Sequence, residues 1–299
     1  MKQVLVLMST FNGEHYLAQQ LDSIFSQKGC EVKVCVRDDG SEDGTVPILR
    51  KYALTHPLTF IQGVNRGPAE SFLQLIIQAA DSPYYALADQ DDIWDSRKLE
   101  AALKALESYK EVPALYCSDL TVTDENLNVT EDLPLPSNVQ TDFRSAALDP
   151  GYYFGCTMVF NRNLKKVIEK RGMPSSMIMH DLWLAMTASY CGRLIYDPRS
   201  FIRYRNHASN YTVQRKKAGL FEKLAEVKEK RNCSIAEQCA SFMEYFGFAD
   251  DIHSTAGIIS RYPSDKTARL KVCAWIMRRK DMKASRKIKT ILRVLYKTY

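Results

Sequence analysis

Strand, loop and helix alternate four times within the first hundred residues of the sequence. Short apolar runs are each followed by a polar turn and, after the first three turns, by a segment of helical periodicity. The apolar runs are 4–8, 32–36, 58–61 and 84–88, and the helical segments are 16–25, 45–54 and 69–80. Continuous apolar runs are typical of parallel strands buried on both faces. The pattern predicts a Rossmann-like α/β fold, a mostly parallel sheet with helices on both faces.

Polar clusters follow the ends of these four strands. They are Ser9–Asn12, Asp38–Ser41, Asn65–Gly67 and Asp89–Asp92. In an open α/β sheet, ligands bind beyond the carboxyl ends of the strands. We therefore expect a single ligand to meet all four clusters.

The rest of the chain has a different organisation. Between 111 and 212 the pattern is mixed, with short strands, two helices and a Pro-, Asp- and Ser-rich loop at 128–150. Beyond 213 only helices are expected. We predict a catalytic domain over 1–212, with a nucleotide-binding half (about 1–110) and an acceptor-side half (about 111–212). A helical, basic region would then occupy 213–299.

Composition excludes several classes of protein. With 299 residues, 45% of them hydrophobic and 25% charged, the chain is long and apolar enough to bury a core. Its eight cysteines form no CxxC pair, so we expect reduced thiols in a cytosolic protein. The opening apolar run is too short for a signal peptide, and no run of 18 apolar residues occurs. An exported or membrane-spanning protein is therefore not expected.

Three carboxylates, Asp89, Asp91 and Asp92, lie within four residues of one another after the fourth strand. Such close carboxylates repel one another unless a cation or solvent relieves them. Mg²⁺ or Mn²⁺ held by one or two of them beside a diphosphate would do so. The alternative is a solvated acidic turn that caps a helix beginning near Ser96.

Asp39 follows the second strand and has two interpretations. It belongs to a turn that caps the next helix, or its carboxylate accepts the imide N–H of uracil or thymine. The sequence contains no GxxxxGK[ST] or GxGxxG loop. A nucleotide would therefore be held through its base, its ribose and a metal.

Asp181 and His207 also have two interpretations each. Asp181, at the start of an apolar helix, either caps that helix or serves as a general base for an alcohol. His207, after two arginines, is either an ordinary surface histidine or a metal ligand.

Taken together, these segments resemble the family 2 glycosyltransferases of the GT-A fold. The segments are VLVLMSTFNGEHYLAQQLDSIFSQ, VCVRDDGSEDGT, NRGPAESF, ALADQDDIW, MHDLWLAM and YRNHASN, and they cover roughly residues 1–210 in the family's order. A sugar-phosphate nucleotidyltransferase has a similar sheet but would need a Gly-rich loop near the first strand. The single glycine of STFNGEHY argues against that class.

The resemblance implies a role for each site residue. The donor nucleotide-sugar would be bound by Ser9, Phe11, Asn12, Asp39, Arg66, Asp89, Gln90 and Arg205. Asp91 and His207 would hold the metal, Mn²⁺ or Mg²⁺. Asp181 would be the catalytic base, which takes the proton of the acceptor hydroxyl as it attacks the anomeric carbon, so that configuration inverts.

His180 stands where the family usually has Glu, and this variation, together with ADQDDIW, resembles bacterial rhamnosyltransferases of polysaccharide synthesis. The resemblance favours dTDP-L-rhamnose as donor, whereas UDP-linked galactose, glucose or N-acetylhexosamine remain open. The acceptor would be a hydroxyl of a polysaccharide or of a lipid-linked glycan. An inactive nucleotide-sugar-binding scaffold is the alternative from another class.

Residues 266–299 hold twelve Lys or Arg and one acid, Asp281. The net charge of this segment is therefore +11, whereas that of the whole chain is +6. A nucleic-acid binder would spread its charge over the fold, so nucleic acid is not expected. Interleaved apolar residues indicate a helix pair on an anionic membrane surface, with Trp275 in the interface. The alternative is a solvated helical cap. We expect a cytoplasmic protein bound peripherally to the membrane, and the sequence leaves its oligomeric state open.

Overall fold

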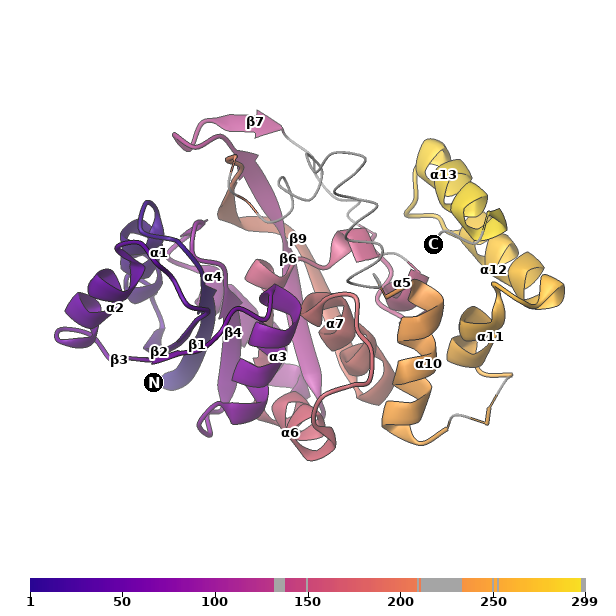
Figure 1. The fold of residues 1–299 in the computed structure, drawn as a ribbon, viewed down its shortest axis with the longest axis horizontal. Helices are drawn as coiled ribbons and strands as arrows, with labels where there is room; N and C mark the ends of the chain where they lie inside the picture. The colour runs from indigo at the N-terminus through magenta and orange to yellow at the C-terminus, as the bar shows by residue number, and fades with distance from the viewer. Residues whose placement is uncertain are drawn as a thin grey trace.

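Four parallel strands form the N-terminal half of the sheet in the computed structural model, which describes residues 1–131, 138–148, 150–208, 210, 233–248, 250–251 and 253–296. They lie in the order β3-β2-β1-β4 (Figure 1). Their bounds are β1 Lys2–Thr10, β2 Cys30–Asp38, β3 Leu58–Gln62 and β4 Tyr84–Ala88. The four predicted strands are confirmed. Because they are parallel, the turns that follow them meet at one edge of the sheet.

The second half of the sheet continues in the order β8-β6-β9-β5, and β7 pairs with β6. The bounds are β5 Ile93–Trp94, β6 Ala114–Thr123, β7 Val129–Glu131, β8 Val159–Asn161 and β9 Arg193–Arg205. β6 and β9 are parallel, whereas β8 runs antiparallel to both β4 and β6. The sheet is therefore mixed in this half, although parallel pairing dominates the whole.

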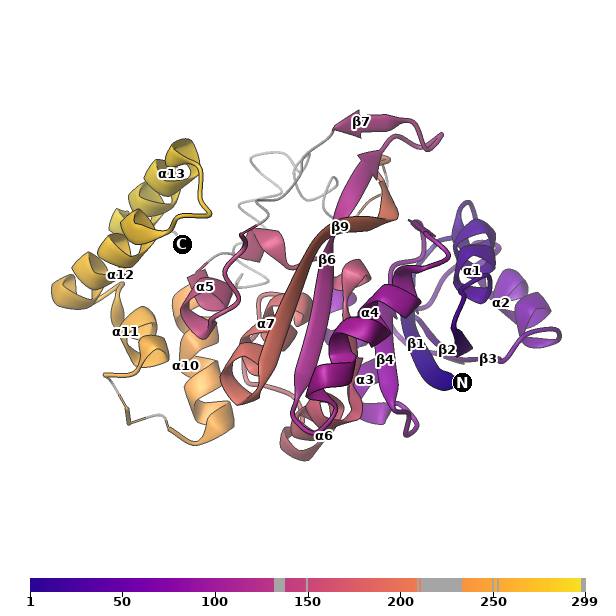
Figure 2. The same cartoon turned by 180° about the vertical axis from the view of Figure 1, so that it is seen from behind.

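Helices cover both faces of the sheet (Figures 1 and 2). On one face lie α1 Leu17–Phe25, α2 Thr45–Ala53 and α4 Lys98–Leu106, and on the other α3 Pro68–Gln78, α6 Arg162–Arg171 and α7 His180–Cys191. β1 shows why its sequence is continuously apolar. Val4, Val6 and Met8 face the first helix layer, and Leu5 and Leu7 face the second.

The C-terminal helices extend the second layer. They are α10 Ile235–Phe246, α11 Thr255–Arg261, α12 Lys266–Arg278 and α13 Ala284–Leu295. Phe242, Ile259 and Val272 belong to the same hydrophobic cluster as Trp183 of α7. The predicted domain boundary near residue 212 lies outside the described residues, but the helices on its far side share one core with the sheet domain.

The segment 128–150, predicted as a loop, contains β7 and the helix α5 Phe143–Leu148. Ala146, Ala147 and Leu148 are buried in the cluster shared with α7. Tertiary packing therefore orders a helix that local composition does not signal. Within the part of the chain that the structure describes, no helix is both long and apolar enough to cross a membrane.

Candidate active site

The turns after β1, β2 and β4 are joined by hydrogen bonds at the carboxyl edge of the sheet. Gln90 donates to the backbone carbonyl of Phe11 at 3.0 Å and accepts from its N–H at 2.9 Å. The Asn12 side-chain oxygen accepts from the N–H of Glu42, and the Asn12 backbone N–H donates to the Ser41 hydroxyl oxygen, both at 2.9 Å. Three of the four predicted polar clusters are therefore in direct contact.

Two backbone features in the turn after β1 permit this contact. Asn12 has a φ of 47°, a left-handed conformation that Asn tolerates better than most residues. At Gly13, a Cβ atom would lie 2.3 Å from the side-chain oxygen of Gln90. The glycine thus leaves room for the Gln90 side chain where the first and fourth turns meet.

Asp39 is buried and its carboxylate has partners on two elements. Arg37 of β2 pairs with Asp39 Oδ1 at 2.9 Å, and the hydroxyl of Ser71 in α3 donates to Oδ2. The N–H of Arg66 approaches Oδ2 at 3.4 Å, which brings the fourth polar cluster to the same place. Asp39 therefore does not cap α2, whose N-terminus has no side-chain cap.

The other predicted donor-binding residues lie around Asp39 with different exposure. Phe11 is 45% exposed, and Ser9 is half-buried in β1 opposite Arg37. The guanidinium of Arg66 is paired with Glu70 at 2.6 Å, and the two side chains are 46% and 38% exposed. Phe11 and Arg66 are thus accessible to a ligand, whereas Asp39 is held in place by its neighbours.

The carboxylates after β4 turn inward. Asp91 and Asp92 are 8% and 0% exposed, and Asp89 is half-buried. Helix α4 begins after Arg97 without a side-chain cap, so this segment is not the solvated helix-capping turn considered as an alternative. Burial, with the charges of Asp91 and Asp181, raises the pKa of Asp89 to about 7. Burial likewise raises the pKa of Asp92. Such clustered acids favour a bound cation.

Asp91 and His207 fit the ligand positions of a divalent metal. His207 Nε2 lies 2.9 Å from Asp91 Oδ2, although 116 residues separate the two in the sequence. Neighbouring ligands about 2.1 Å from an octahedral ion lie about 3.0 Å apart, so this spacing matches two adjacent positions. One oxygen and one imidazole nitrogen are a donor set that suits Mn²⁺. Asn210 also approaches Asp91 Oδ2, at 3.4 Å.

Another group, formed by Asp89, Asp92 and Cys156, also has its candidate ligand atoms within 4.8 Å of one another. Burial raises the pKa of the Cys156 thiol, which hydrogen-bonds to Asp92. A protonated thiol is a poor ligand for hard cations such as Mg²⁺. We therefore favour the Asp91–His207 pair as the metal site.

Arg205 holds the acidic turn in place from the end of β9. Its Nε donates to the Asp91 carbonyl at 3.0 Å, its Nη2 to Gln19 at 2.7 Å, and its N–H to Asp92 at 3.2 Å. The guanidinium also lies 4.3 Å over the Tyr16 ring, and the residue is 2% exposed. In this geometry Arg205 faces protein groups rather than the position expected for a diphosphate.

Asp181 stands in the first turn of α7, but it is not the N-cap. That position is Met179, which forms no side-chain cap. The Asp181 carboxylate accepts from Leu182 N–H at 2.6 Å and from the Gly155 backbone. Burial raises its pKa to about 6. A carboxylate with this pKa is a competent general base near neutral pH, and its charge is close enough to act on Asp89.

His180 packs beside Asp181 as a neutral, buried ring. It stacks on Phe72 with the ring centroids 4.2 Å apart, and burial lowers its pKa to about 3. Neither ring nitrogen has a hydrogen-bond partner among the residues that the structure describes. His180 therefore adds no second charge next to Asp181.

Several contact residues were not singled out from the sequence. Arg37 and Ser71 hold Asp39, and Tyr16 contacts both His207, at 4.7 Å between rings, and Arg205. Tyr16 follows the apolar period of α1, which conceals its place at the site. Ser71 and Asn210 lie inside the family-like segments NRGPAESF and YRNHASN, and that is the only sequence signal that points to them.

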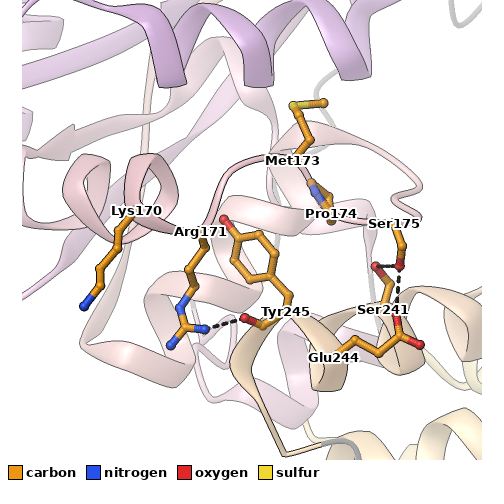
Figure 3. A pocket seen from close by; sticks show the side chains of 8 residues that line it. All are labelled: Lys170, Arg171, Met173, Pro174, Ser175, Ser241, Glu244 and Tyr245. Carbon is orange, nitrogen blue, oxygen red and sulfur yellow. Dashed lines mark hydrogen bonds between the residues drawn. The ribbon is translucent and has the colours of Figure 1, made fainter.

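A pocket of about 520 Å³ lies elsewhere, between the end of α6 and α10 (Figure 3). Its lining includes Arg171, Ser175 and Glu244, and Ser175 donates to Glu244 at 3.0 Å. Arg171, which lines the pocket, is close to Cys191 at the end of α7, whereas Asp181 lies at the start of that helix. None of the predicted site residues lines the pocket.

Comparison with known proteins identifies the family. Residues 5–168 match the family described as Glycosyl transferase family 2. The dTDP-rhamnosyl transferase RfbG of Shigella flexneri is 27% identical over 217 residues, which cover 68% of this chain and 72% of that protein.

Two solved structures share the fold. S. aureus TarS 1-349 in complex with UDP-GlcNAc has a TM-score of 0.58 at 19% identity, covering 98% of this chain and 90% of that one. The mannosyltransferase PcManGT from Pyrobaculum calidifontis, in complex with GDP-Man and Mn²⁺, has a TM-score of 0.58 at 18% identity, covering 99% and 86%. The predicted GT-A fold is confirmed, and the chain belongs to glycosyl transferase family 2.

Proposed function

We propose that this protein is an inverting, metal-dependent glycosyltransferase that moves L-rhamnose from dTDP-L-rhamnose to a hydroxyl of a glycan acceptor. The observation that carries the proposal is the meeting of Asp39, the Asp91–His207 pair and Asp181 at one edge of the sheet. These residues supply base recognition, a metal site and a general base. They come from four separate stretches of the chain.

The thymine or uracil ring would lie against Phe11 and Asn12, with its imide N–H toward Asp39 and with Arg66 nearby. Asp39 is held by Arg37 and Ser71, so its carboxylate is already oriented before a ligand arrives. Asp89 would face the ribose, and Ser9 would line the pocket. Gln90 hydrogen-bonds to the backbone of Phe11, and the guanidinium of Arg205 is buried. We therefore infer that these two residues position the site and do not contact the donor directly.

Asp181 would accept the proton of the attacking acceptor hydroxyl. Direct attack on the anomeric carbon from the face opposite the diphosphate inverts configuration and forms no covalent sugar intermediate. A divalent cation held by Asp91 and His207 would offset the charge that develops on the departing diphosphate. The pKa of about 6 at Asp181 leaves the carboxylate mostly ionised at pH 7.

The similarity to RfbG supports rhamnose as the transferred sugar, since that relative is described as a dTDP-rhamnosyl transferase. We infer a polysaccharide or lipid-linked glycan as acceptor, in the synthesis of a bacterial cell-surface glycan. Attachment to an anionic membrane surface belongs to the same proposal, because a lipid-linked acceptor would lie there.

Calorimetric titration tests the donor. The protein would be titrated with dTDP-L-rhamnose, dTDP, UDP and UDP-sugars, each with Mn²⁺ and again with EDTA. We expect metal-dependent binding of the dTDP series, with dTDP-L-rhamnose then consumed in the presence of an acceptor. Tighter binding of UDP-sugars would show that the donor is a UDP-sugar and not dTDP-L-rhamnose. Binding without turnover on any acceptor would favour an inactive scaffold.

A further inference from the structure

The two last helices form a hairpin that is fixed to the rest of the protein on one side. Ala268, Val272 and Ile276 of α12 and Val294 of α13 face the shared core. Figures 1 and 2 show α12 and α13 side by side at the end of the molecule opposite the N-terminal strands. One face of each helix is thus used for folding, and the other is left outside.

The outer face of each helix carries an apolar stripe. In α12 the stripe is Leu270, Ala274 and Met277, and in α13 it is Ile288, Leu292 and Leu295. Both have the spacing i, i+4, i+7, which places the side chains on one face of a helix. Leu270, Met277 and Ile288 are 68%, 59% and 58% exposed. Exposed apolar side chains that line one face of a helix indicate an interaction surface.

Cations flank both stripes. The exposed basic residues of the hairpin are Lys266, Lys271, Arg278, Lys280, Lys283, Lys289 and Arg293. Asp281, the one acid between 266 and 296, is buried and pairs with Arg279 at 2.5 Å. The exposed charge of the hairpin is therefore of one sign, with apolar side chains between the cations.

The hairpin is held firmly to the segment 140–153. Arg279 and Asp281 are both buried, and Asp281 accepts from Gln140 N–H at 3.4 Å while its carbonyl accepts from the Tyr152 hydroxyl at 3.2 Å. Trp275, expected at a lipid interface, instead lies under the guanidinium of Arg144 at 4.3 Å, so it belongs to this attachment. A surface fixed in this way would transmit its orientation to the catalytic half.

We propose that the outer face of the α12–α13 hairpin, formed by these two apolar stripes and the flanking cations, docks onto an anionic lipid bilayer. Charge complementarity favours this occupant, because cations beside an apolar stripe match phosphate headgroups beside acyl chains. A helical cap that only faces solvent would not require apolar stripes at helical spacing. The proposal extends the proposed function by naming the membrane-binding residues, but vesicle binding requires no substrate and is tested independently of transfer.

Sedimentation of the full chain with vesicles tests the surface. We expect the protein to pellet with vesicles of phosphatidylcholine and phosphatidylglycerol (about 3:1) and not with phosphatidylcholine alone. Binding should weaken between about 0.01 M and about 1 M salt, because the Debye length falls from about 30 Å to about 3 Å. No pelleting with the anionic vesicles at low salt would overturn the proposal.

Two sets of variants separate the apolar and charged contributions. Ile288→Ser with Leu292→Ser should weaken binding to anionic vesicles at least tenfold, since two inserted side chains are lost. Lys271→Gln, Lys280→Gln and Lys289→Gln together should weaken it roughly fivefold per lysine and reduce its salt dependence. The matched control is Leu54→Ser with Val129→Ser, two residues that are 86% and 62% exposed and lie outside the hairpin.

Unchanged vesicle binding in the Ile288/Leu292 variant, or an equal loss in the Leu54/Val129 control, would contradict the assignment. Thermal unfolding of each variant shows whether the fold is retained. If the wild-type chain self-associates without lipid and the Ile288/Leu292 variant does not, while neither binds vesicles, the surface binds a second copy and the membrane proposal is wrong.

Discussion

Asp181 shows how a single residue combines local and distant effects. Its backbone lies in the first turn of α7, and its carboxylate accepts hydrogen bonds from Leu182 and Gly155. Burial raises its pKa more than these bonds lower it, so the carboxylate is more basic than an exposed Asp. The neutral His180 at its side leaves this balance undisturbed.

Asp181→Asn tests the role of the base. We expect kcat for transfer to fall about 10²–10⁴-fold, because the amide cannot accept the acceptor proton. Calorimetry should show that Mn²⁺-dependent binding of dTDP is retained, since the hydrogen bonds of Asp181 join it to Leu182 and Gly155 and not to the proposed nucleotide contacts. Transfer at the wild-type rate would remove Asp181 from the base role.

The pKa of Asp181 predicts a pH dependence of transfer. The ionised carboxylate is the active form, so kcat/KM should fall as pH is lowered through about 6, approaching about tenfold per pH unit below it. Rates would be measured between pH 5 and pH 8 at saturating Mn²⁺. Binding of dTDP over the same range is the control, and a rate that stays flat down to pH 5 would contradict the assignment.

At the scale of elements, the acidic turn is held by β9. Arg205 joins the turn after β4, helix α1 and the strand that leads to His207. Asp91 and His207, the proposed metal ligands, are thereby brought together by a residue that need not touch the donor.

Arg205→Lys separates this positioning role from charge. Lysine keeps the charge but lacks the planar fork, so we expect Mn²⁺–dTDP binding to weaken at least tenfold and stability to fall by about 1.5–3 kcal/mol. Arg203→Lys is the matched control, because Arg203 is exposed on the same strand. Calorimetry and thermal unfolding measure both effects. Equal losses of binding and stability in the two variants would show that Arg205 does not position the acidic turn.

Elements also show what the sequence could and could not predict. The strands β1 to β4 were recognised because burial on both faces makes each a continuous apolar run. The strand β5 has two residues, too few to show any periodicity, and it was not predicted. β9 has polar residues at Asp197–Ser200, where its register with β6 shifts, so only its apolar start was recognised.

The site was predictable in the same uneven way. Residues that follow strands, such as Asp39 and Asp91, are marked by topology. The pairing of Asp91 with His207 spans 116 residues, and only the family resemblance pointed to it. Contacts such as Ser71 with Asp39 depend on how α3 lies against the sheet, and no local pattern encodes that packing.

For the whole molecule, the shared core makes the C-terminal helices part of one folding unit. Ile276→Ala should lower the free energy of unfolding by about 2–5 kcal/mol in a single transition, because Ile276 is 1% exposed in the cluster that includes α7. Met277→Ala, at the adjacent position with 59% exposure, should change it by no more than about 0.5 kcal/mol. A separate early transition in Ile276→Ala that leaves the sheet domain folded would show two independent units.

The attachment of the hairpin to the shared core also bears on how a gene for such a protein can change. A stop codon after residue 265 would remove Val272, Ile276 and Val294 from the cluster that covers α7 and would expose the apolar residues packed against them. The product would be a misfolded chain and not a freely diffusing enzyme. Truncation would therefore not release the enzyme from the proposed membrane surface, and a change of location would require substitutions on the outer face of the hairpin.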